Sequence, residues 1–421
     1  MSASTISAEQ QAFLDHATTA FAVSDDELNT IVTRTHAELF RGLSTSQGSE
    51  LLMKPTFIRP PTARPSSVSL GMSISASGSR IRLTRITINS NSTPLRTHTQ
   101  VFTAQSTSQT VFDFAAYCVR EFVQHDSMSL PIGVTIGVPC GALTEYSRGL
   151  HTSDVGRNLC AAFVRSHLNV HVTSVTHGAV SALVASRIHT NATQVAAVFD
   201  GGVNAAYVEQ LGQVCKLRVS SETKPSLVAI DTDIGNFGSR ALPVTLWDRR
   251  VDRESNRAGR VFEKLVGGHF MGEIVRNLII DMIDRRLLFT SCSVQEISVP
   301  YSFHSAYMGP IIEDLEAVGN VFAAEFGIRC SPVEGRIVRS LCAIVVGRAA
   351  RVAGAVLAAV VLKAKADKVV LSGTVFDANP RMLDETVREM QSRLPDGAKT
   401  EVVVQSPSDE LFGAAVNAAC I

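Results

Sequence analysis

The stretch Asp200-Gly201-Gly202-Val203-Asn204-Ala205-Ala206-Tyr207-Val208-Glu209 decides how the chain is expected to fold. It follows the apolar run 195–199, and two apolar runs on either side of a glycine-rich turn are typical of paired strands. Upstream, the segment from residue 171 that contains Thr176-His177-Gly178 is predicted to be helical. A strand pair preceded by a helix is therefore expected at the centre of the chain.

Helical and strand periodicities alternate along the rest of the chain. Ser24 and Glu27 form a capping box before a helix, and four prolines between 55 and 65 mark a linker. Helices are expected over 7–22, 25–42, 112–124, 262–288 and 380–394, and strands over 68–74, 81–88, 132–138, 195–199, 205–209 and 369–371. The apolar run 352–362 is too short to span a bilayer and is predicted to be a buried helix with basic ends.

Composition favours a compact intracellular protein of two domains. The 421 residues exceed what one core usually serves, and 45% of them are hydrophobic. Lys+Arg and Asp+Glu number 39 each, so the chain has no net charge that would attract nucleic acid or an anionic membrane. The N-terminus lacks a signal-peptide core, so the cytoplasm is the expected compartment, with the nucleus or the mitochondrial surface as alternatives. The eight scattered cysteines are predicted to be buried reduced thiols, and no metal site is expected.

Four motifs occur in one order along the chain: Asn204 to Glu209, Phe262 to Gly268, Met271 to Arg276, and Arg348 to Arg351. Together they resemble the hexokinase family over most of the chain. The resemblance implies an α/β fold of the actin-like ATPase (ribonuclease H-like) type, with two α/β domains around a cleft. It further implies N-terminal helices and a linker at 1–65 that pack on the large domain, a small domain at 66–200 and a large domain at 201–421.

The resemblance implies a nucleotide site whose glycines and carboxylates are partly replaced. Its expected members are Ser73, Ser77, Arg80, Gly202, Ser372, Gly373 and Thr374. Ser73 stands where the family has a carboxylate that helps to organise magnesium. Asp200 stands where the family has a glycine, and a carboxylate about 5 Å from a phosphate oxygen repels it by roughly 1–3 kcal/mol. Ser408 to Leu411 replaces a further glycine-rich stretch. The resemblance therefore implies a degenerate nucleotide site.

The sugar site implied by the resemblance is retained in part, enough for weak carbohydrate binding. Its expected members are Ser147, Arg148, Thr176, His177, Asn204, Asp233 and Glu263. His177 replaces the aspartate that serves the family as general base. Three interpretations of His177 stay open: a substitute base with a suitable pKa, a residue tuned for a new ligand or a pH response, and a tolerated residue in a site without chemical demand.

The favoured hypothesis is a catalytically impaired, hexokinase-like regulatory or sugar-sensing protein in carbon metabolism. It would resemble the atypical hexokinases of filamentous fungi and bind a hexose and protein partners in carbon or nutrient signalling, with no cofactor, nucleic acid or membrane span. The alternative is a slow ATP-dependent hexose kinase that converts glucose to glucose 6-phosphate, for which Mg-ATP would be required. A pure sugar sensor is a third hypothesis.

Overall fold

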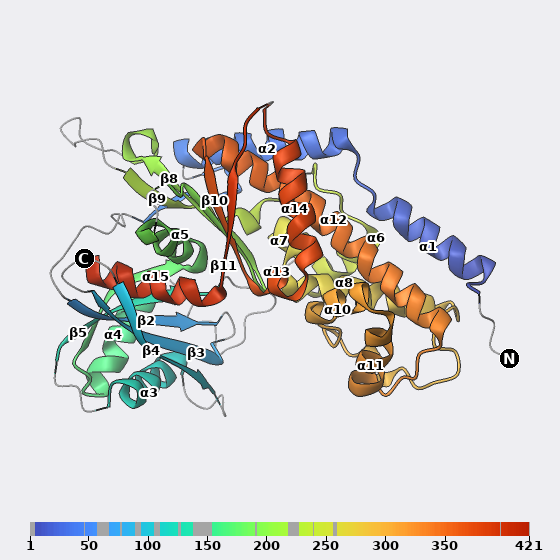
Figure 1. The fold of residues 1–421 in the computed structure, drawn as a ribbon, viewed down its shortest axis with the longest axis horizontal. Helices are drawn as coiled ribbons and strands as arrows, with labels where there is room; N and C mark the ends of the chain where they lie inside the picture. The colour runs from blue at the N-terminus through green and yellow to red at the C-terminus, as the bar shows by residue number, and fades with distance from the viewer. Residues whose placement is uncertain are drawn as a thin grey trace.

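Two β-sheets with helices packed on their faces make up the computed structural model (Figure 1). The structure describes residues 5–45, 47–56, 67–75, 78–88, 94–104, 110–124, 128–137, 154–189, 192–217, 227–238, 240–255, 259–395 and 397–420. The expected sugar residues Ser147 and Arg148 and the expected nucleotide residue Ser77 lie outside these ranges.

A five-stranded sheet has the order β4-β3-β2-β5-β6. Its strands are β2 (Ser67–Ile74), β3 (Arg80–Ile88), β4 (Pro94–Thr103), β5 (Leu130–Ile136) and β6 (Val170–His177). β2, β3 and β4 are antiparallel neighbours, whereas β2, β5 and β6 run parallel. Helices α3 (Val111–Val123) and α4 (Val155–Arg165) share an apolar core with this sheet.

The other face of this sheet packs against the C-terminal helix α15 (Pro407–Cys420). Two strand glycines permit the close approach. A Cβ atom at Gly71 would lie 2.3 Å from the carbonyl oxygen of Leu411, and one at Gly133 would lie 1.9 Å from that of Ala414. Any side chain at these positions would push α15 away from the sheet.

A six-stranded sheet has the order β1-β9-β8-β7-β10-β11. Its strands are β1 (Lys54–Pro55), β7 (Val195–Phe199), β8 (Val203–Gln210), β9 (Leu227–Asp231), β10 (Lys368–Ser372) and β11 (Glu401–Gln405). Helix α5 (Gly178–His189) lies with α15 between the two sheets, and their alanine and valine side chains join one apolar core (Figure 1).

The opposite face of the six-stranded sheet contacts the helix α12 (Pro332–Ala364), which has 33 residues. α12 is long and apolar enough to cross a membrane by length and composition, but 83% of its most apolar window is buried inside the protein. Its apolar surface therefore forms core, as expected for 352–362. Further helices here are α6 (Leu246–Glu254), α9 (Gln295–Ser298), α10 (Met308–Glu313), α11 (Leu315–Phe326), α13 (Thr374–Ala378) and α14 (Pro380–Ser392).

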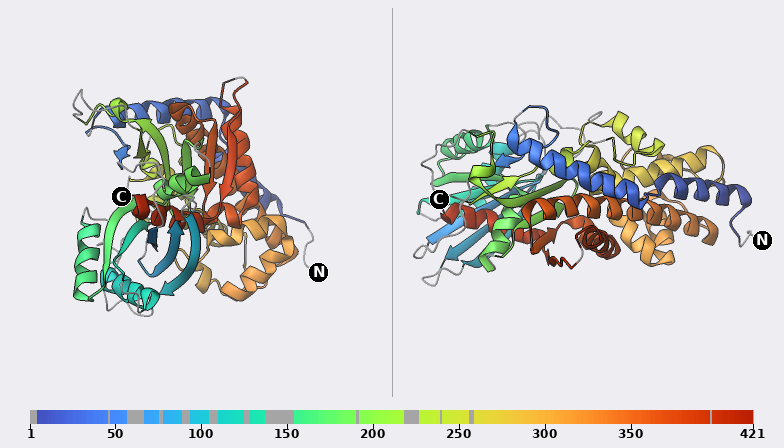
Figure 2. Two further views of the ribbon diagram at one scale, coloured as in Figure 1. Left: turned by 60° about the vertical axis from the view of Figure 1, so that its left-hand side comes forward. Right: turned by 90° about the horizontal axis from the view of Figure 1, so that it is seen from above.

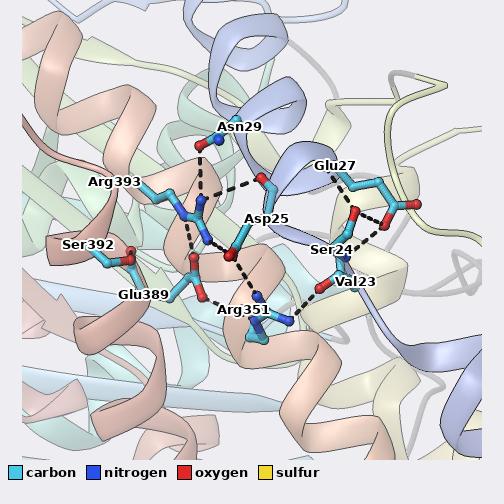
Figure 3. A network of polar contacts seen from close by, with 9 residues as sticks. All are labelled: Val23, Ser24, Asp25, Glu27, Asn29, Arg351, Glu389, Ser392 and Arg393. Atoms are coloured by element: carbon cyan, nitrogen blue, oxygen red, sulfur yellow. Dashed lines mark hydrogen bonds and ion pairs between the residues drawn. The ribbon is translucent and has the colours of Figure 1, made fainter.

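The N-terminal helices α1 (Ala8–Phe21) and α2 (Asp25–Ser44) lie along α12 (Figure 2). Ion pairs add to this apolar contact at the start of α2 (Figure 3). Arg351 of α12 bonds to Glu389 of α14 at 3.1 Å and to Asp25 of α2 at 3.2 Å, while Arg393 bonds to Asn29 at 2.9 Å. One polar network thus connects three helices that are distant in sequence.

Three sequence-based predictions are wrong in part. Residues 170–177 form strand β6 instead of a helix, because this segment is rich in β-branched residues and pairs with β5. The long helix expected over 262–288 is divided into α7 (Val261–Val266) and α8 (Gly268–Asp284). Gly267 is extended there, and the backbone N–H of Gly268 donates to Asp200 instead, at 2.8 Å. Among the described cysteines, Cys118 and Cys342 are buried, whereas Cys215 and Cys292 are exposed.

Candidate functional site

The ends of strands from both sheets meet at a cluster of polar side chains. His177 is the last residue of β6, Asp231 is the last residue of β9, and Asn204 lies near the start of β8. The Nδ1 atom of His177 lies 2.7 Å from Oδ2 of Asp231, and Nδ2 of Asn204 donates to Oδ1 of Asp231 at 2.7 Å. Asp231 is 5% exposed. Both oxygens of this buried carboxylate therefore have partners.

The chain turns from strand to helix directly after His177. Gly178 begins α5, and a Cβ atom at this glycine would lie 2.4 Å from Oε2 of Glu410. The glycine therefore lets the strand end and the helix start pass close to α15. His177 is held at this turn with its side chain 33% exposed, so it can reach a ligand.

A second group of side chains lies beside the first. Arg260 precedes α7, and its guanidinium bonds to both expected sugar-binding carboxylates. Its Nη1 lies 3.0 Å from Oδ1 of Asp233, and its Nε and Nη2 donate to the two oxygens of Glu263 at 2.8 and 2.9 Å. Glu263 also accepts the backbone N–H of Val203 at 3.0 Å. The structure thus brings Asn204, Asp233 and Glu263 together, with Arg260 between the acids.

Burial and pairing shift the pKa values of the side chains in this cluster. Burial alone would lower the pKa of His177, but the hydrogen bond and charge of Asp231 outweigh it and raise that pKa above its usual value. Burial tends to raise the pKa of Asp231, yet His177 and Asn204 hold it below the usual value. Burial raises the pKa values of Asp233 and Glu263, with Arg260 opposing the change. The pairing therefore favours the charged forms of both His177 and Asp231.

Thr176, the other expected sugar residue of this segment, is directed into the fold. It is buried, and its hydroxyl lies 2.9 Å from the hydroxyl of Ser181 in α5. It also lies 3.4 Å from the carbonyl oxygen of Val134 in β5. These contacts help to fix the strand-to-helix turn next to His177.

Three of the expected nucleotide residues, Gly202, Gly373 and Thr374, lie in or next to the turns that follow β7 and β10. The carboxylate of Asp200 accepts hydrogen bonds from the backbone N–H and the hydroxyl of Thr374, at 2.7 and 2.9 Å. Gly202 closes the first turn, since its carbonyl accepts the N–H of Asp200 at 2.9 Å. Gly373 has φ +129°, and a Cβ there would lie 2.1 Å from the carbonyl of Phe199. The Asp200 carboxylate thus occupies both the backbone and the side-chain donor of Thr374.

Two further expected nucleotide residues, Ser73 and Ser372, contact other protein groups. Ser73 is buried and accepts a hydrogen bond from Arg82 at 3.3 Å, whereas Arg80 is exposed. The hydroxyl of Ser372 lies 3.5 Å from Oε1 of Glu410. Burial, reinforced by the charge of Asp200, raises the pKa of Glu410 to about 8. This carboxyl is therefore mainly protonated at neutral pH.

Sequence reasoning missed Asp231 and Arg260 as members of the site. Signals for both exist: Asp231 ends an apolar strand two positions before Asp233, and Arg260 stands three positions before Glu263. Among the described residues, no three His, Cys, Asp or Glu side chains are grouped as ligands for a metal ion.

Comparisons with known proteins identify related chains. Two family models, each described as hexokinase, match residues 14–188 and 194–420. Hexokinase-1 of Schizosaccharomyces pombe is 24% identical, with 98% of this chain and 90% of that protein covered. Hexokinase-2 of Candida albicans is 27% identical, with 95% and 89% covered.

Solved structures share the fold. The hexokinase from Schistosoma mansoni complexed with glucose superimposes with a TM-score of 0.85 at 21% identity, covering 98% of this chain and all of that one. A second crystal structure of hexokinase gives a TM-score of 0.76 at 19% identity, again with 98% of this chain and all of that one covered. The predicted actin-like ATPase fold with two α/β domains is confirmed.

Proposed function

The chain belongs to the hexokinase family, and from this premise we propose that it is an ATP-dependent hexose kinase of low turnover, acting on a hexose such as glucose. One observation carries the proposal: Asn204, Asp233 and Glu263 gather beside His177, whose ring is bonded to Asp231. This arrangement supplies hydrogen-bond partners for sugar hydroxyls and a group able to accept a proton.

His177 serves as the base in this proposal. Its Nδ1 atom faces the carboxylate of Asp231, so Nε2 is the ring nitrogen that takes the proton of the attacking sugar hydroxyl. Asp231 orients the ring and stabilises the imidazolium that forms, as a carboxylate does for histidine in other catalytic sites. The raised pKa of His177 also limits the rate, because more of the ring is already protonated at neutral pH.

The expected nucleotide site is poorly suited to binding the phosphoryl donor, Mg-ATP. Ser73 brings no carboxylate toward a magnesium ion, and Asp200 already occupies the N–H of Thr374. The residues present do not fit a firmly held metal, so we assign no step to one. Weak donor binding is the second reason to expect slow turnover.

The hydrogen bonds between Asp200 and Thr374 favour a second candidate function. If Asp200 and Thr374 stay joined, the protein binds a hexose without phosphorylating it and acts as a regulatory or sugar-sensing protein in carbon metabolism. It would then resemble the atypical hexokinases of filamentous fungi, and its output would be contact with protein partners.

A coupled phosphorylation assay with a hexose panel and ATP tests the proposal. We expect slow ATP-dependent sugar phosphate formation that is lost in Glu263→Gln and kept in Glu401→Gln, a matched change of an exposed carboxylate. Absence of product together with stabilisation by a hexose alone would favour the sensor. Ligand at 100 times its Kd adds about 2.7 kcal/mol to the free energy of unfolding, which thermal melting detects.

A further inference from the structure

We propose that Arg260 determines sugar affinity by acting as an internal competitor of the ligand. Its guanidinium bonds to the acceptor oxygens of Asp233 and Glu263 to which hexose hydroxyls would donate, so a hexose has to displace it. The inference rests on the proposed hexose site and adds a residue that sequence reasoning did not place there.

The contact is close and sheltered from water. Three nitrogens of the guanidinium reach three carboxylate oxygens within 3.0 Å, two of them on Glu263 in a forked pair. The side chains of Arg260 and Asp233 are 16% and 18% exposed, and that of Glu263 is 1% exposed. Forked, charge-assisted bonds of this kind are roughly twice as strong as neutral ones.

The backbone conformation places the Arg260 guanidinium against the two carboxylates. Arg260 and Asp233 both lie in the left-handed region, with φ +54° and +55°, which residues with side chains adopt infrequently. Gly235 leaves the space for the guanidinium. A Cβ atom there would lie 2.8 Å from Nη2 of Arg260 and 3.0 Å from Oε2 of Glu263. Three positions on two segments therefore cooperate in placing one charged group.

The consequence for a neutral sugar follows from hydrogen-bond capacity. Both oxygens of Glu263 accept bonds from Arg260, and one of them also accepts the N–H of Val203. A carboxylate has about four acceptor positions, and these bonds use three of them. A sugar that donates two hydroxyls to Glu263 therefore replaces a charged donor with a neutral one. A hexose binds weakly for this reason, and affinity rises when the competitor loses its charge.

Calorimetric titration with glucose in the absence of nucleotide tests the inference independently of turnover. Arg260→Gln removes the charge and keeps a donor, and Arg260→Lys is the matched control that keeps the charge. We expect Arg260→Gln to lower the Kd for glucose at least tenfold, and Arg260→Lys, which keeps the charge but loses the forked bonds, to lower it by a smaller factor than Arg260→Gln does. Glucose binding by Arg260→Gln alone, with none detectable in the wild type, supports the inference as well.

Equal or weaker binding by a folded Arg260→Gln overturns the inference and leaves the hexose site standing. No glucose binding by any of the three proteins overturns the hexose site itself. If a variant fails to fold, a measurement on the wild type still tests the inference. The NMR resonance of the Arg260 Nε–H should shift as glucose saturates the protein. An unshifted resonance during demonstrated glucose binding contradicts displacement.

Discussion

The imidazole of His177 and the carboxylate of Asp231 are joined by a 2.7 Å hydrogen bond that connects the end of β6 to the end of β9. The two strands belong to different sheets, so the bond links the two halves of the molecule. His177 is therefore a histidine whose ring is oriented by an acid, and that acid raises its pKa. This pairing favours a substitute base over a tolerated residue.

Asp231→Asn should lower the pKa of His177. Asparagine keeps the shape of the partner but removes the negative charge that opposes the effect of burial. The base is then free at lower pH, so the acidic limb of the pH–rate profile should move to lower pH. NMR titration of the ring checks the cause, with the exposed His167 as an internal control. An unchanged titration of His177 would show that Asp231 does not set its charge.

Asp200→Gly should strengthen ATP binding and speed phosphorylation. The change frees the N–H of Thr374 and removes a negative charge from the turns that follow β7 and β10, where the ATP phosphates are proposed to bind. Repulsion of roughly 1–3 kcal/mol corresponds to a gain in affinity of about 5-fold to 150-fold. Asp200→Asn separates the two effects, because it removes the charge and retains an acceptor for Thr374. ATP titration measures the affinity, and the coupled assay measures the rate of phosphorylation. If neither variant binds ATP more tightly or reacts faster, Asp200 does not weaken nucleotide binding.

Glu410→Gln should stabilise the protein increasingly as pH rises. The pKa of Glu410 is about 8 in the folded protein against a reference value of 4.5. Between these values the folded state retains a proton that the unfolded chain releases. The contribution of Glu410 to the free energy of unfolding therefore falls by about 1.4 kcal/mol per pH unit, then levels off above pH 8.

Denaturant unfolding at pH 4.5 and pH 8.5 measures this effect. The difference between Glu410→Gln and the wild type should be small at the lower pH and reach a few kcal/mol at the higher one. The exposed Glu401→Gln should show no such trend. A difference that is the same at both pH values would mean that Glu410 ionises normally in the folded protein.

Arg348→Ala should destabilise the fold severely. Arg348 of α12 is fully buried, donates to Oδ1 of Asp248 at 2.8 Å and lies over the ring of Phe21 at 4.4 Å. Its removal leaves the Asp248 carboxylate buried without its cation, which costs about 3–5 kcal/mol. Urea unfolding measures the loss, with the exposed Arg388→Ala as control. Equal, small losses in the two variants would refute a structural role for the pair.

Local patterns in the sequence predicted many of the elements well. The capping box of Ser24 and Glu27 is present at the start of α2, and the hairpin expected over 68–88 forms β2 and β3. Such features depend on neighbouring residues, which a sequence displays directly. The failures at β6 and at Gly267 lie where strand pairing and a distant turn override local preference.

The sequence by itself determined the α/β character, the family and the set of polar residues available for a sugar site, because periodicity and ordered motifs are local properties of the chain. Only the tertiary structure decided which charges meet. His177 and Asp231 are 54 positions apart, Asp200 and Thr374 are 174 apart, and Arg260 contacts Asp233 across 27. These pairs form because two sheets and their connecting turns pack in one arrangement, and that packing also sets each pKa through burial and neighbouring charge.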